Sequence, residues 1–80
     1  MNWYDDKSLT HLGMIEFGFN SITEIEVYRD KNGTLLFCDH DEPDDIMDID
    51  YVKSCVEDCN HPRYDDQVAY AEKICGMKLR

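Results

Sequence analysis

The densest group of ionisable side chains lies in residues 39–50, DHDEPDDIMDID, where seven of twelve residues are acidic and none is lysine or arginine. Clustered carboxylates suit either a hard cation such as calcium or a basic protein surface. The segment does not fit an EF-hand, because with Asp39 at position 1 the glycine required at position 6 is replaced by Asp44. We therefore interpret the segment as an acidic surface for a basic partner.

Cysteines and histidines form the second group with the chemistry of a site. Cys38 and His40 are two residues apart, which places both side chains on one face of a strand. Cys55 and Cys59 are one helical turn apart, and His61 follows them. A tetrahedral zinc site built from these five residues is one alternative, although the spacing matches no standard finger or ribbon. The other reading, which we prefer, is that the thiols are free and buried.

The sequence contains no recognisable catalytic motif. Cys59 and His61 are too close in the chain, at the end of a helix, to form a nucleophile and its base. A Gly-x-Ser-x-Gly motif and a phosphate-binding glycine loop are also missing from the sequence. Carboxylates in an exposed acidic loop lack the burial that adjusts catalytic pKa values. We expect a protein that is not an enzyme and uses no cofactor.

Composition points to one compact domain over residues 1–80 with basic partners. The net charge of −10 repels nucleic acid and anionic membranes, while 42% hydrophobic residues are enough for a core. The first ten residues lack the basic and apolar regions of a signal peptide, and no apolar run approaches the roughly 20 residues of a membrane span. We expect a cytoplasmic protein, in the host cytoplasm if a phage encodes it.

A β-hairpin is predicted around Asn32-Gly33. Apolar and polar residues alternate over 23–28, Asn32-Gly33 suits a two-residue type I′ turn, and residues 34–39 form the returning strand. The pairs that this turn implies are Val27 with Cys38, Ile25 with His40, Tyr28 with Phe37, and Asp30 with Leu35.

Residues 8–19 fit either a helix that ends at Gly18 or a strand over 14–19, and we favour the strand because a helix would place Glu16 in its apolar arc. As a strand, with a three-residue loop at 20–22, it pairs Ile15 with Val27 and Phe17 with Ile25 and brings Met14 beside Tyr28.

Two helices are predicted in the C-terminal half. Asp48 can cap a helix whose apolar positions extend from Ile49 to Cys59. After the break at 60–62, a second helix with apolar positions from Tyr64 to Cys75 ends at Gly76. The fold class is therefore α+β: a small antiparallel β-meander of two or three strands followed by an αα-hairpin, with αββαα as the alternative.

These elements define a candidate partner-binding surface with an acidic and an apolar part. The acidic part is Asp39, Asp41, Glu42, Asp44, Asp45, Asp48, Asp50, Glu57, Asp58, Glu24 and Glu26, and the apolar part is Met14, Tyr28, Leu35 and Phe37. The expected function is inhibition of a basic, nucleic-acid-binding protein by occupation of its groove. In size and charge alone, the chain resembles small phage inhibitors of host nucleases, such as anti-CRISPR and anti-restriction proteins. The alternatives are a zinc-stabilised Cys/His module and a homo-oligomeric accessory protein.

Overall fold

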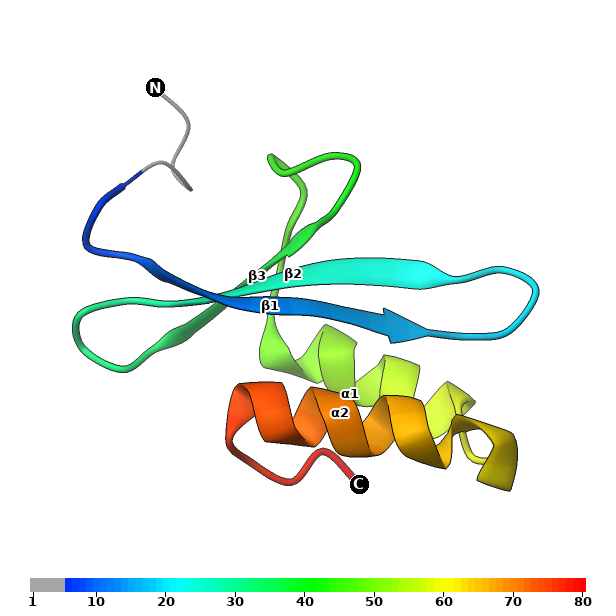
Figure 1. Ribbon diagram of the computed structural model, residues 1–80. Coiled ribbons are helices and arrows are strands. Elements are labelled where there is room, and N and C mark those ends of the chain that lie inside the picture. Colours follow the sequence, from blue (N-terminus) through cyan, green and yellow to red (C-terminus); the bar gives the residue numbers. More distant parts are fainter. Residues whose placement is uncertain (1–5) are drawn as a thin grey trace.

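An antiparallel sheet in the order β1-β2-β3-β4 forms one layer of the computed structural model, which describes residues 6–80. The strands are β1 (Thr10–Phe17), β2 (Thr23–Arg29), β3 (Leu35–Asp39) and β4 (Ile46–Met47). The second layer contains α1 (Ile49–Asp58), the 3-10 turn η2 (Pro62–Tyr64) and α2 (Asp65–Cys75). Figure 1 shows α1 and α2 running in opposite directions against one face of the sheet. The predicted α+β meander with a C-terminal αα-hairpin is confirmed.

Residues 10–17 form a strand, so the αββαα alternative is wrong. Ile15 and Phe17 are only 0% and 3% exposed, whereas Glu16 between them is exposed. This alternation matches the period of a strand, and a helix would have placed the Glu16 carboxylate among apolar residues.

The predicted register between β2 and β3 is wrong by one residue. Val27 lies opposite Phe37, and Tyr28 lies opposite Leu36. The turn has three residues between Asp30 and Thr34 instead of two, because the Asp30 carboxylate accepts hydrogen bonds from the backbone N–H groups of Asn32 (2.8 Å) and Thr34 (2.9 Å). A one-residue shift exchanges the faces of a strand, so the Phe37 side chain joins the core.

The predicted register between β1 and β2 is wrong by two residues, which keeps each side chain on its face. Ile15 lies opposite Ile25, and Phe17 lies opposite Thr23. The connecting loop has five residues because hydrogen bonds to a side chain of α2 hold it in place. Gly18 donates its N–H to the Gln67 side-chain oxygen (3.0 Å), and its carbonyl accepts from the Gln67 amide (2.8 Å).

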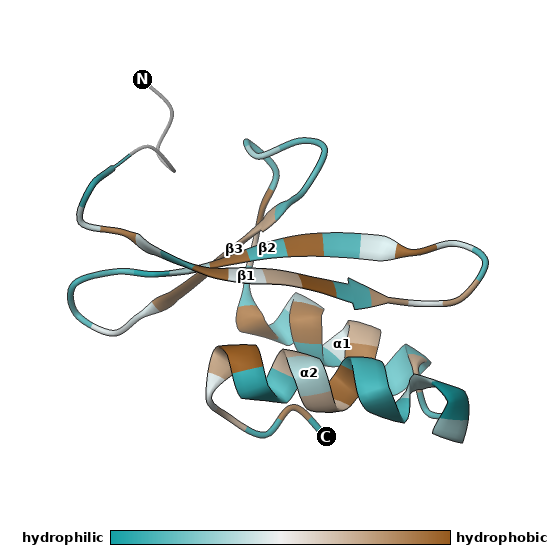
Figure 2. Ribbon diagram, viewed as in Figure 1, coloured by the Kyte–Doolittle hydropathy of each residue, from teal (hydrophilic) through white to brown (hydrophobic). Residues whose placement is uncertain are grey.

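The helices follow their predicted limits except at the start of α2, where residues 62–64 form the 3-10 turn η2. Asp48 caps α1 by accepting the Tyr51 N–H (2.9 Å), and Gly76 ends α2 in the left-handed conformation. The side chains that pack on the sheet are Val52, Val56, Cys59, Val68, Ala71 and Cys75. Figure 2 shows hydrophobic and hydrophilic residues interspersed along β1, β2 and both helices, as two amphipathic layers require. Within residues 6–80, no helix has the length and apolar content needed to cross a bilayer.

Substitution of Gly18 should destabilise the fold much more than substitution of Gly33. Both glycines have positive φ, +119° and +86°, but a Cβ at Gly18 would collide with the Ser21 carbonyl oxygen, whereas a Cβ at Gly33 meets nothing within 4 Å. We expect Gly33→Ala to lower the free energy of unfolding by about 1 kcal/mol and Gly18→Ala by about 3 kcal/mol. Urea unfolding measures both, and equal losses would contradict this account of the loop.

Candidate functional site

The first part of the predicted acidic binding surface forms a hairpin. We call residues 39–47 the acidic hairpin. The Asp39 carboxylate accepts the backbone N–H groups of Asp41 (2.8 Å) and Glu42 (3.0 Å), and the Asp39 N–H donates to the Asp45 carbonyl (3.1 Å). Figure 1 shows this loop, in green, rising from the sheet away from both helices. These hydrogen bonds hold the turn of the segment.

The strand β4 within this segment was not predicted. Ile46 lies opposite Cys38, and Met47 lies opposite Phe37. Two residues are too few to show strand periodicity, and the carboxylates around them have low strand propensity. The only available signal was the pair of apolar residues inside an otherwise acidic run.

The carboxylates of the acidic hairpin carry uncompensated charge. Asp41, Glu42, Asp44 and Asp45 are exposed. In the part of the chain that the structure describes, the ion pairs join His11 and His40 to Glu26, and Arg80 to Asp65, so none involves a hairpin carboxylate. The field of these carboxylates is therefore directed to solvent, where it attracts positively charged groups.

The acidic hairpin and the first turn of α1 border a hollow of about 390 Å³, which we call the acidic hollow. It is lined by Asp39, Asp45, Ile46, Met47, Asp48 and Tyr51. The side chains of Ile46 and Tyr51 are 58% and 45% exposed. The nearby Cys55, partial burial, and the carboxylates of Asp45 and Asp39 raise the pKa of Tyr51, so its ring is a neutral phenol. An aromatic ring beside carboxylates suits a lysine or arginine side chain.

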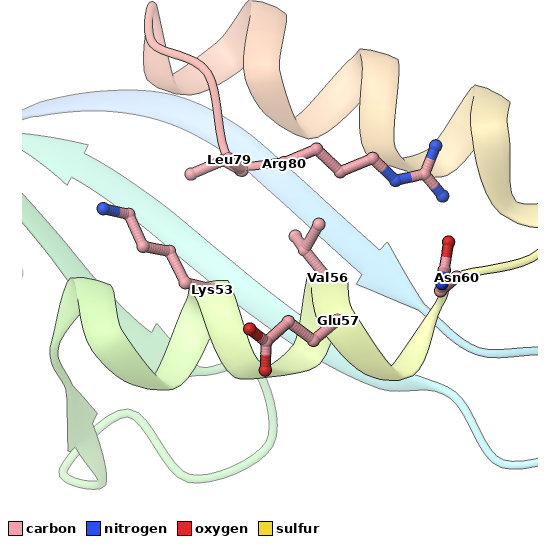
Figure 3. A pocket seen from close by; sticks show the side chains of 6 residues that line it. All are labelled: Lys53, Val56, Glu57, Asn60, Leu79 and Arg80. Atoms are coloured by element: carbon pink, nitrogen blue, oxygen red, sulfur yellow. The ribbon is translucent and has the colours of Figure 1, made fainter.

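Glu57 and Asp58 lie away from the acidic hairpin. They are near the C-terminal end of α1, about 10–12 Å along the helix axis from Asp50 in its first turn. Glu57 instead lines a different hollow, beside Lys53 (Figure 3). The structure thus places Asp48 at the acidic hollow and Asp50 in the adjoining first turn of α1, but it leaves the two later helix acids apart.

Glu24 and Glu26 face the side of the sheet opposite the helices. Glu26 is already engaged, because its carboxylate lies 3.3 Å from His11 Nε2 and 3.8 Å from His40 Nδ1. Protonated histidines there would neutralise part of its charge. These two glutamates form a separate acidic patch.

The predicted apolar strip does not exist as a surface. Phe37 is 1% exposed and Leu35 packs against the core, so both lie on the helix side of the sheet. Met14 and Tyr28 lie on the other side, with Leu36 opposite Tyr28. The cause is the one-residue shift between β2 and β3.

The predicted zinc ligands are not brought together. Cys38 lies on the sheet face opposite the helices, whereas Cys55 and Cys59 are on α1. Within residues 6–80, no three histidine, cysteine, aspartate or glutamate side chains are placed to hold a metal ion. Burial, followed by the carboxylates of Glu26 and Asp39, raises the pKa of the Cys38 thiol to about 11. Protonated thiols are poor nucleophiles and poor metal ligands.

The C-terminal segment lines one side of the hollow shown in Figure 3. This hollow of about 350 Å³ is lined by Lys53, Val56, Glu57, Asn60, Leu79 and Arg80. The Arg80 guanidinium donates to the Cys59 carbonyl (2.8 Å) at the end of α1 and to Asp65 Oδ1 (2.8 Å). Leu79 is 6% exposed. These contacts hold the C-terminal segment in place, and we call them, with the burial of Leu79, the C-terminal lock.

Comparison with protein-family models, curated proteins and solved structures found no match for the chain. Any functional inference therefore depends on the geometry and charge of these residues.

Neutralising Glu72 should weaken the C-terminal lock. Its carboxylate accepts the N–H groups of Leu79 (2.7 Å) and Arg80 (3.4 Å), and these bonds lower its pKa below the ordinary value of 4.5. Stability from this contact is present above about pH 4.5 and lost as the pH falls through the lowered pKa. We expect Glu72→Gln to lower the melting temperature at pH 7 and to match the wild type in acid.

Thermal unfolding between pH 2 and 7 measures this effect. Glu42→Gln is the matched control, since Glu42 is exposed on the acidic hairpin and does not line the hollow beside Leu79 and Arg80. An equal loss in both variants would contradict the proposed lock.

Zinc should leave the protein unchanged, because Cys38 and the thiols of α1 lie on opposite sides of the sheet. We expect native mass spectrometry to show the apo mass after incubation with zinc, and a chelator to leave the melting temperature unaltered. Stoichiometric zinc whose removal unfolds the chain would establish the Cys/His module instead.

Proposed function

We propose that this protein is a small, acidic, non-enzymatic binding protein that occupies the basic nucleic-acid-binding surface of a partner protein. The observation that supports it is the acidic hairpin, an ordered loop whose exposed carboxylates have no cationic partner in the described chain. A surface that binds phosphates through lysine and arginine offers the complementary charges. The protein thereby acts as an inhibitor that competes with nucleic acid.

The ordered loop favours this function over diffuse charge attraction. The Asp39 carboxylate holds the turn through two backbone hydrogen bonds, so the loop loses little conformational freedom on binding. The whole chain adds to the effect, because a net charge of −10 steers a basic partner during encounter. Anti-CRISPR and anti-restriction inhibitors from phages, which the chain resembles in size and charge, exemplify this type of protein.

Neutralising Asp41, Glu42, Asp44 and Asp45 together should weaken binding to such a partner. Asp39 is left unchanged, so the turn and the fold are retained. At about 0.5 kcal/mol for each exposed ion pair, the four losses weaken affinity roughly 30-fold and flatten its dependence on salt. Partners captured from a nuclease-treated lysate at low and high salt are identified, purified and titrated with both proteins.

A mobility-shift assay then measures whether the protein displaces nucleic acid from the purified partner. The matched comparison uses two neutralised charges in each variant: Asp41→Asn with Asp44→Asn on the hairpin, and Glu16→Gln with Asp66→Asn away from it. Only the hairpin pair should reduce displacement. Equal effects would mean that net charge alone matters, and unchanged displacement by the fourfold variant would refute nucleic-acid mimicry.

A further inference from the structure

A second surface feature lies where β4 stops short. β4 pairs only with Phe37 and Cys38, so Leu35 and Leu36 of β3 extend beyond it. A groove of about 560 Å³ lies at this place, and we call it the apolar groove. Its apolar side chains include Leu35, Met47, Ile49 and Met77, and Met77 is 39% exposed. The groove is thus accessible to an apolar side chain from another molecule.

The backbone beside the groove is available for strand pairing. Successive residues of β3 direct their N–H and C=O groups to alternate sides: His40 donates to Glu24 on β2, and Asp39 donates to Asp45 on the β4 side. By this alternation Leu35 points its backbone groups to the β4 side. Since β4 ends opposite Phe37, no strand of the described chain pairs with Leu35 there.

The apolar groove and the acidic hollow share two lining residues. Met47 and Asp48 line both, whereas Asp39 and Asp45 line the acidic hollow only. An apolar surface that leads into carboxylates suits a segment with alternating apolar and basic residues. A second copy of this chain fits poorly, because each copy carries a net charge of −10.

We infer that the apolar groove docks an extended segment of a basic protein. The segment pairs with the Leu35 backbone as an added strand, inserts an apolar side chain between Met47 and Met77, and directs a neighbouring lysine or arginine to the acidic hollow. Strand addition of this kind combines backbone hydrogen bonds with pockets for alternate side chains. The inference rests on the proposed function, since the docked segment belongs to the same basic partner.

The test uses synthetic peptides and the full chain. The probe is acetyl-Arg-Leu-Arg-Leu-Arg-Leu-amide, titrated into ¹⁵N-labelled protein and followed by NMR. We expect saturable shifts at Leu35, Ile49 and Met77, with further shifts at Tyr51. A peptide with serine in place of leucine keeps the charge, and a peptide N-methylated at alternate residues loses the strand hydrogen bonds, so both should bind at least about fivefold more weakly.

Protein variants give the matching comparison. Met77→Ser alters an exposed groove residue without touching the core, and it should weaken binding of the leucine peptide about fivefold. Ile22→Ser changes a residue of similar exposure in the β1–β2 loop and should have no effect. Sedimentation of the free protein should show a monomer.

Three results would overturn the inference: no binding of the leucine peptide at millimolar concentration, equal binding of the serine peptide, or a dimer that Met77→Ser dissociates. The inference can also fail while the proposed function holds. If the hairpin variants lose displacement of nucleic acid while Met77→Ser retains it, the acidic hairpin is the binding surface and the groove is not.

Discussion

The carboxylate of Asp30 accepts hydrogen bonds from the backbone N–H groups of Asn32 and Thr34, and this turn sets the register of β3 against β2. The register decides that Phe37 faces the helices and that Cys38 faces away from them. A slip of one residue would expose Phe37 and bury Cys38 among the helices. The core, the separation of the thiols and the position of the apolar groove all depend on this turn.

Sequence periodicity was sufficient for the helices and for the class of fold. The spacing of apolar residues from Ile49 to Cys59 identified α1. Asp48 begins α1 and the left-handed Gly76 ends α2, as the capping rules predict. The register of the strands could not be predicted from periodicity, because register depends on side-chain contacts that periodicity does not record. Asn32-Gly33 is compatible with a turn of two or three residues. The clamp between Gly18 and Gln67 joins residues 49 positions apart.

The acidic charge of the candidate site was predicted from the sequence, but its shape was not. The hairpin carboxylates were identified from composition, whereas β4 and the hollow behind it depend on two apolar residues, Ile46 and Met47, inside the acidic run. The fold tolerates this concentration of charge because some of the carboxylates accept hydrogen bonds from the nearby backbone. Asp39 and Asp48 accept backbone N–H groups, and acids at the N-terminus of a helix gain about 0.3–1 kcal/mol each from its dipole.

Charge and apolar contact make different contributions to recognition by a chain of this size. Exposed carboxylates accelerate encounter and set its salt dependence, but any basic surface satisfies them. Discrimination requires a desolvated contact that tolerates few side chains, and such contacts dominate binding energy. In this protein the two meet at Met47 and Asp48, which line both the apolar groove and the acidic hollow. The proposed docking depends on the short length of β4, because a longer strand would pair with Leu35 and fill the place that the docked segment needs.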